Sequence, residues 1–179
     1  LAPAFKMKFW NIGAEGQVLM GALSTAIVMV NFSTLSTPLL FTLMIVSSVV
    51  MGAIWGLIPA IFKAKWNVNE TLFTLMMNYV AMQLVDYYYN IWKGSKASLG
   101  MLNPGTKAGY LPEYNGSSNN IIVTVVLIIT VLMYIYLKKT KHGYEIAVVG
   151  ESENTARYAG IDVKKVIIRT MLISGAVCG

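Results

Sequence analysis

The sequence predicts an all-α, polytopic membrane protein with about four full transmembrane spans and the start of a fifth. Hydrophobic residues make up 56% of the chain and charged residues 12%, and the mean hydropathy is +0.60. A soluble domain carries about twice that charged fraction. Several apolar stretches approach the ~20 residues that a helix needs to cross a bilayer. These stretches are continuous rather than alternating, which favours helices over a β-barrel.

The chain has the features of one transmembrane domain, residues 1–179. It lacks an initiator methionine and a cleavable signal peptide, and it stops inside an apolar segment at Gly179. We therefore expect an internal fragment of a longer membrane protein. The one cysteine, Cys178, excludes an internal disulfide. The net charge of +6 does not indicate a nucleic-acid partner, because the lysines fall in loops beside the apolar runs.

The first two spans are expected at about Val18–Phe32 and Leu39–Phe62. Before the first, NIGAEGQ (residues 11–17) places two glycines around Glu15, which favours a helix start or break. In the second span, small residues recur at every fourth position, a pattern typical of close helix contact in a bundle. These residues are Ser48, Gly52, Gly56 and Ala60.

The third span, Thr71 to about Trp92, is the least apolar, and NVNE (residues 67–70) supplies its N-cap. At ~100° per residue, its polar side chains fall within one arc of about 140°. They are Asn78, Tyr79, Gln83, Asp86 and Asn90. Polar groups at membrane depth are costly unless they face protein or water. Two interpretations stay open: the helix lines a hydrated path for a polar solute, or Asn78 and Gln83 make interhelical hydrogen bonds while Asp86 lies close to the outer surface.

A polar loop, residues 93–120, is expected to form exposed turns before the fourth span, Ile121–Leu137. A second polar loop follows at residues 138–165, and a fifth span begins at Val166, where Gly175 and Gly179 repeat the GxxxG spacing.

The loop of residues 138–165 contains the signals of one short helix. Ser152 suits the N-cap, Glu153 suits the first turn, and Gly160 suits the left-handed position after the helix. About two helical turns are not stable alone in water, so the flanking spans or a partner protein must hold them. The alternative is an ordinary connector.

The basic residues predict the orientation. If the first loop is cytosolic, four crossings place 11 of the 14 basic residues inside and leave Lys93, Lys96 and Lys107 outside. The opposite topology would place three inside. Because basic residues concentrate in cytosolic loops, we expect the first loop and residues 138–165 to be cytosolic.

The chain lacks the motifs of the common enzyme sites. It has no GxxxxGK[ST] phosphate loop, no HExxH, no CxxC and no specific Ser-His-Asp pattern. His142 stands beside three lysines and is expected to be a solvated loop histidine rather than a metal ligand. Glu15 could be catalytic only with a second carboxylate or a metal, and no such group is near in sequence. We expect no cofactor.

Three stretches, in order, resemble the permease subunits of bacterial ABC importers in the branch for simple sugars and nucleosides. They are NIGAEGQVLMGA (residues 11–22), WGLIPAIFKAKWNVNETLFTLMMNYVA (residues 55–81) and GYEIAVVGESENTARYAGIDV (residues 143–163). The first is closer to nucleoside-type than to ribose-type permeases. The chain departs from the usual pattern at residues 152–155, which read Ser-Glu-Asn-Thr where relatives commonly show Asn-Pro-Glu-Ala. That difference puts Ser152 and Thr155 in doubt as contact residues.

The resemblance implies a permease in the bacterial cytoplasmic membrane, embedded in the lipid bilayer, that is not itself an enzyme. Its implied partners are cytosolic ATP-binding subunits, a second permease subunit and an extracytoplasmic substrate-binding lipoprotein. The short helix then resembles a coupling helix that docks on the ATPase, with Arg157 and Tyr158 as anchors. The residues implied in this contact are Gly150, Glu151, Asn154, Ala156, Arg157, Tyr158 and Gly160.

An uncharged, polyhydroxylated solute needs amide and aromatic groups along its path. The candidate pathway residues are Asn11, Glu15, Gln17, Asn78, Gln83 and Asp86. An ATP-independent channel or carrier is the main alternative, and it would not need a capped cytosolic helix. A membrane enzyme or scaffold is the third, and it would need titratable pairs within a span.

Overall fold

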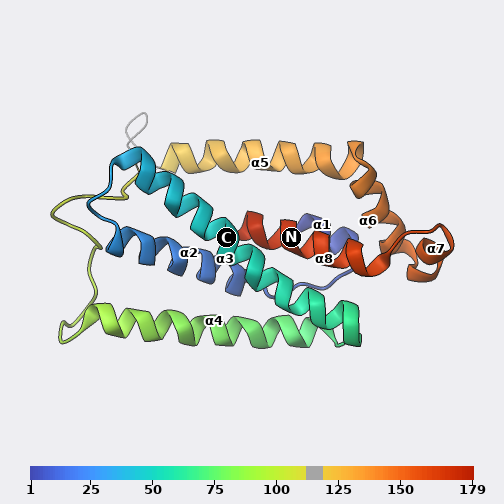
Figure 1. The fold of residues 1–179 in the computed structure, drawn as a ribbon, viewed down its shortest axis with the longest axis horizontal. Helices are drawn as coiled ribbons and strands as arrows, with labels where there is room; N and C mark the ends of the chain where they lie inside the picture. The colour runs from blue at the N-terminus through green and yellow to red at the C-terminus, as the bar shows by residue number, and fades with distance from the viewer. Residues whose placement is uncertain (112–118) are drawn as a thin grey trace.

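The computed structural model describes residues 1–111 and 119–179 and is helical throughout the described regular elements (Figure 1). The predicted all-α class is confirmed. The part of the loop 93–120 that falls at residues 112–118 lies outside the described residues. The helices are α1 (Ala2–Lys6), α2 (Ala14–Asn31), α3 (Thr37–Trp66), α4 (Glu70–Lys93), α5 (Asn119–Lys139), α6 (Lys141–Glu151), α7 (Glu153–Tyr158) and α8 (Val163–Cys178).

The long helices lie where the spans were predicted. Helix α2 takes residues from the NIGAEGQ side, as expected for a helix that starts there, and the Asn69 side chain caps α4 by accepting the Leu72 N–H at 3.1 Å. Among the described residues, two helices are long and apolar enough to cross a membrane, Thr37–Trp66 and Asn120–Lys139. Helix α4 carries the polar arc, and α8, with 16 residues, covers the predicted start of the fifth span.

The fold contains a helix that the sequence did not predict, α6. Thr140 is its N-cap, with Oγ1 accepting the Gly143 N–H at 3.1 Å. Its buried side, which includes Ile146 and Val149, packs on α1 and α8. Gly143 and Gly150 lower its intrinsic helix propensity by about 1 kcal/mol each, so packing rather than propensity stabilises this helix.

Helices α2, α3 and α8 pack at glycines, which confirms the predicted small-residue contact. A Cβ at Gly56 would lie 2.8 Å from the Met171 carbonyl oxygen, and one at Gly21 would lie 2.5 Å from the Gly179 oxygen. Gly52 and Gly175 approach each other still more closely through their backbones. Only glycine allows helix backbones to come this near.

Helix α5 stands to one side of this packed unit (Figure 1). No described residue in the apolar window of α5 is buried. By contrast, α1, α6 and α8 share a hydrophobic core that includes Met7, Phe9, Ile146, Val166 and Met171. The ends of α3 and α5, all of α6 and α7 and the start of α8 gather at one end of the molecule (Figure 1). That end carries the segments predicted to be cytosolic.

Candidate functional site

Helix α7 begins and ends with the capping residues that the sequence indicated. Ser152 Oγ accepts the Thr155 N–H at 3.3 Å, and Gly160 has a φ of +76°. The Gly160 N–H donates to Arg157 O at 3.0 Å and the Ile161 N–H to Ala156 O at 2.9 Å. These two bonds form a Schellman motif, so both ends of a six-residue helix are fixed.

The seven predicted coupling residues divide into a packing group and an exposed group. Ala156 is fully buried, Gly150 packs so closely on the Lys6 carbonyl that a Cβ has no room, and Gly160 makes the turn. The exposed residues are Glu151, Asn154, Arg157 and Tyr158. Tyr158 is the most prominent, with 94% of its surface exposed. One side of α7 therefore anchors the helix and the other faces away from the molecule.

The joint between α6 and α7 is a single residue. Ser152 ends α6, where its N–H donates to Val148 O at 3.1 Å, and it caps α7 with its side chain. No flexible loop separates the two helices, so α6 and α7 form one unit, which we call the coupling unit (residues 141–158).

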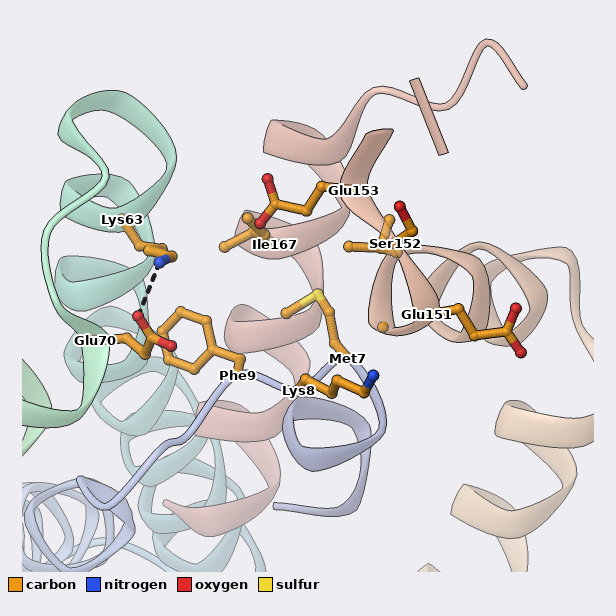
Figure 2. Close-up of a pocket in the computed structure, with 11 residues that line it drawn as sticks. Met7, Lys8, Phe9, Lys63, Glu70, Glu151, Ser152, Glu153 and Ile167 are labelled. Carbon is orange, nitrogen blue, oxygen red and sulfur yellow. Dashed lines mark ion pairs between the residues drawn. The ribbon is translucent and has the colours of Figure 1, made fainter. Parts of the chain in front are cut away.

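A cleft of about 230 Å³ separates the coupling unit from the turn between α3 and α4 (Figure 2). On one wall, Lys63 Nζ and Glu70 Oε2 form an ion pair at 2.9 Å. The other wall carries Glu151, Ser152 and Glu153, and the segment that follows α1 contributes Met7, Lys8 and Phe9 (Figure 2). Glu153 pairs with Arg157 at 3.6 Å across the exposed surface of α7, a geometry that contributes little to stability.

The start of α2 is capped by a side chain from another helix. Its N-cap residue, Gly13, has no side chain to accept a helix N–H. Asn78 of α4 takes this role: its Oδ1 accepts the Gly16 N–H at 2.8 Å, and its Nδ2 donates to Ile12 O at 3.0 Å. Asn78 is 4% exposed. The interhelical hydrogen bonding considered for Asn78 is therefore present.

Two other predicted pathway residues, Asn11 and Gln17, lie buried in the same region, each 1% exposed. Asn11 Oδ1 accepts the Gly13 N–H at 3.0 Å. Among the described residues, Asn11 Nδ2, Gln17 Oε1 and the nearby Trp55 Nε1 have no hydrogen-bond partner. Leaving a buried polar atom unpaired costs about 1–3 kcal/mol, so this region holds polar groups with unused hydrogen-bonding capacity.

The remaining predicted pathway residues, Glu15, Gln83 and Asp86, are exposed. On α4 the polar arc continues through Tyr79 and Asn90, both exposed, beside the packed side that holds Thr74, Asn78 and Ala81. The structure thus brings Asn11, Gln17 and Asn78 together inside the bundle and leaves the other three on the outside of the chain.

A polar cluster between α6 and α8 was missed by sequence reasoning. Arg169 contacts His142 Nε2 at 3.0 Å and forms an ion pair with Glu145. The expectation of a solvated His142 is wrong, because the ring is half-buried against Arg169 and Tyr136. His142 and Glu145 lie three residues apart, which places them on one helix face once α6 is known.

The start of α8 is capped by Asp162, whose Oδ1 accepts the Lys165 N–H at 3.2 Å. This hydrogen bond from the Lys165 backbone lowers the pKa of the Asp162 carboxyl. Within the two described ranges of the chain, no group of three or more His, Cys, Asp or Glu side chains could hold a metal ion.

The chain matches the family described as the permease component of the branched-chain amino acid transport system, over residues 2–179. It belongs to this permease family. As a member, it is a polytopic helical membrane protein of the transport-permease class, and the resemblance seen in three sequence motifs is confirmed.

Three relatives were compared with this permease. It is 31% identical to the guanosine ABC transporter permease protein of Bacillus subtilis over the whole chain and 52% of the relative. It is 33% identical to the glucose ABC transporter permease protein of Haloferax volcanii, covering 96% of the chain and 48% of the relative. It is 29% identical to the nucleoside ABC transporter permease protein of Lactococcus lactis, covering 99% of the chain and 52% of the relative. The chain spans about half the length of these curated relatives, and no solved structure matches it.

Proposed function

We propose that this permease forms part of the membrane-spanning subunit of an ATP-driven importer in the bacterial cytoplasmic membrane, with α7 as the helix that docks on a separate ATP-binding subunit. The observation that carries the proposal is the capped, rigid α7 with Tyr158 fully outward at the end where the basic residues gather. Tyrosine and arginine are favoured anchors of protein interfaces. Only Ser152 separates α6 from α7, so we expect the two helices to move as one unit. A displacement of α7 by the ATP-binding subunit would then be transmitted through α6 to α1 and α8.

The proposed solute is a nucleoside or a simple sugar, since the compared relatives are named for guanosine, nucleoside and glucose. The proposed assembly contains ATP-binding subunits, a second permease subunit that is identical or related, and an extracytoplasmic substrate-binding protein. The permease contributes alternating access, in which a packed bundle changes between discrete arrangements, and the ATPase subunit carries out hydrolysis.

Tyr158→Ala tests the docking role. We expect it to weaken binding of the ATP-binding subunit about thirtyfold, the loss of a ~2 kcal/mol interface anchor. ATP-driven uptake of labelled guanosine into vesicles should fall accordingly. Both measurements, a binding titration in detergent and the uptake assay, use the full-length protein.

The matched control is Tyr144→Ala, because Tyr144 is another exposed tyrosine on the same coupling unit but outside α7. Equal loss of binding in both variants would contradict a specific role of α7. Uptake that continues after ATP depletion would contradict the importer function and favour an ATP-independent carrier.

The proposed solute path follows the exposed polar arc of α4, at Gln83 and Asp86, and ends at the buried amides of Asn11, Gln17 and Asn78. Polar side chains on the outer surface of a membrane helix are costly in lipid, which supports a wet or protein-facing environment for the arc. Glu15, at the first turn of α2, completes the proposed set. The unpaired Asn11 and Gln17 groups supply hydrogen-bonding capacity for a polyhydroxylated solute.

Gln83→Leu and Asp86→Asn test this path. Each should raise the apparent KM for solute uptake about fivefold to tenfold, the loss of one hydrogen bond, while the melting temperature stays unchanged because both residues are exposed. Val80→Ala, an exposed apolar position outside the arc, is the control. Unchanged KM in both variants would remove Gln83 and Asp86 from the path.

A further inference from the structure

The polar cluster between α6 and α8 has one central group, the Arg169 guanidinium. It reaches two acceptors on α6 at once, His142 Nε2 at 3.0 Å and Glu145 Oε2. The Arg169 and Glu145 side chains are 37% and 17% exposed. Among the described residues of α8, Arg169 is the charged side chain that lies beyond the first turn.

The contact between Arg169 and His142 depends on which ring nitrogen carries a proton. A guanidinium only donates hydrogen bonds, so the facing Nε2 must accept, and the ring must then be neutral with its proton on Nδ1. A protonated ring would place a donor against a donor and a positive charge beside Arg169. Histidine is the side chain whose charge ordinarily changes between pH 5 and 8.

We propose that Arg169 is a positioning residue that ties the coupling unit to α8, and that this tie holds only while His142 is neutral. The proposal rests on the proposed function, because it specifies how a push on α7 reaches the α8 span. The covalent link between α7 and α8 is the short turn at residues 159–162. Arg169, two turns into α8, adds a polar connection to the apolar packing of α6 and α7 on α8. Cytosolic acidification releases this connection.

No neighbouring group among the described residues is placed to replace neutral His142 as a hydrogen-bond acceptor for Arg169. The charged or titratable groups around this contact are Lys141 and Glu145 on α6, Tyr136 on α5, Asp162 at the cap of α8, and Lys165 and Arg169 on α8, with Lys6 of α1 bonded to the nearby Leu137. Asp162 pairs with Lys165 at 3.3 Å. Glu145 already pairs with Arg169, and Lys6 Nζ donates to the Leu137 carbonyl at 3.1 Å. On α7, Glu153 and Arg157 pair with each other. A proton on His142 therefore adds to a surplus of positive charge.

The first test is Arg169→Met in the protein as its gene encodes it, assembled with its ATPase partner in vesicles. We expect the amount of guanosine moved per ATP hydrolysed to fall at least about tenfold, because the contact with His142 and the ion pair with Glu145 are both lost. Arg169→Lys should fall nearly as far, because a single ammonium cannot hold both acceptors in the fork geometry. Lys164→Gln, which removes an exposed positive charge from the first turn of the same helix, should have no effect. An unchanged ratio in Arg169→Met would overturn the proposal.

The second test is the pH profile of the same ratio. In the unmodified protein it should fall when the cytosolic side goes from about pH 7.5 to about pH 6. His142→Gln keeps a neutral acceptor and should make the profile flat. A profile that is the same with histidine or glutamine at this position would overturn the role of His142.

Hydrogen exchange of the α6 amides separates this proposal from the proposed function, since it requires no transport. The protection factors of the α6 amides, which correct for the slower intrinsic exchange at low pH, should be lower in Arg169→Met, and lower at pH 6 than at pH 7.5 only when His142 is present. If the unmodified protein shows no ATP-driven uptake, the importer function is contradicted. The exchange data would still test whether Arg169 holds α6 on α8. Unchanged α6 exchange in Arg169→Met would show that α6 and α8 are not held together by this contact.

Discussion

Replacing Asn78 with leucine is expected to lower the free energy of unfolding by about 2–4 kcal/mol, because one buried and one part-buried hydrogen bond to α2 and its preceding turn are lost. The Gly16 N–H and the Ile12 carbonyl, which bond to Asn78 at 2.8 and 3.0 Å, would both be left without it. Leucine has the same number of side-chain heavy atoms and the same branching, so no cavity is left and the lost hydrogen bonds are the main change. The measurement is thermal unfolding of the purified protein in detergent, followed by tryptophan fluorescence, since Trp55 lies beside Gly16.

Asn90→Leu is the matched control, because it is an exposed amide on the same helix and should change stability by less than about 0.5 kcal/mol. Asn78→Asp keeps the acceptor for Gly16 but loses the donor and buries a carboxylate, so it should also destabilise. If Asn78→Leu were as stable as Asn90→Leu and changed only the KM for solute, Asn78 would act only as a solute contact, and its role as the cap of α2 would be contradicted.

Replacing Gly175 with leucine is expected to produce the second large loss. The backbones of Gly52 and Gly175 are in contact, and a Cβ at Gly175 would also lie 3.2 Å from Gly56 Cα. The better helix propensity of a larger residue returns at most about 1 kcal/mol, whereas overpacking costs about 1–3 kcal/mol or more. Because neither backbone can rotate away, the cost should prevail. We expect a melting temperature lower by about 5–10 °C.

Gly175→Ala should give the same sign with a smaller size. Gly105→Ala is the control, since a Cβ there meets nothing within 4 Å. A stabilised Gly175→Ala, with the gain that alanine gives in an open helix, would contradict the close crossing of α3 and α8.

Features set by local sequence could be predicted before the structure was known. Ser152 and Gly160 cap α7 as expected because capping depends on a few neighbouring residues. The four-residue spacing of Gly52 and Gly56 likewise places them on one side of α3, and that side meets α8. Helix α6 could not be predicted this way, because two glycines weaken its pattern and its stability comes from α1 and α8.

The candidate site was predictable by residue type and less by position. The polar arc of α4 is real, yet Asn78 at its edge turns into the bundle while Gln83 and Asp86 stay outside. That division depends on where α2 begins, which the α4 sequence does not contain. The contact of Arg169 with His142 joins residues 27 positions apart, and it requires the packing of α6 on α8 to be known.

The most direct measurement of the central claim is a photo-cross-linking side chain placed at position 158 in the protein as its gene encodes it, expressed in membranes with its neighbouring gene products. The account predicts a covalent adduct with an ATP-binding subunit. The same probe at exposed position 101, in the loop between α4 and α5, should give none. An adduct from position 158 with an extracytoplasmic protein, or labelling of that position by a membrane-impermeant reagent from outside the cell, would contradict it.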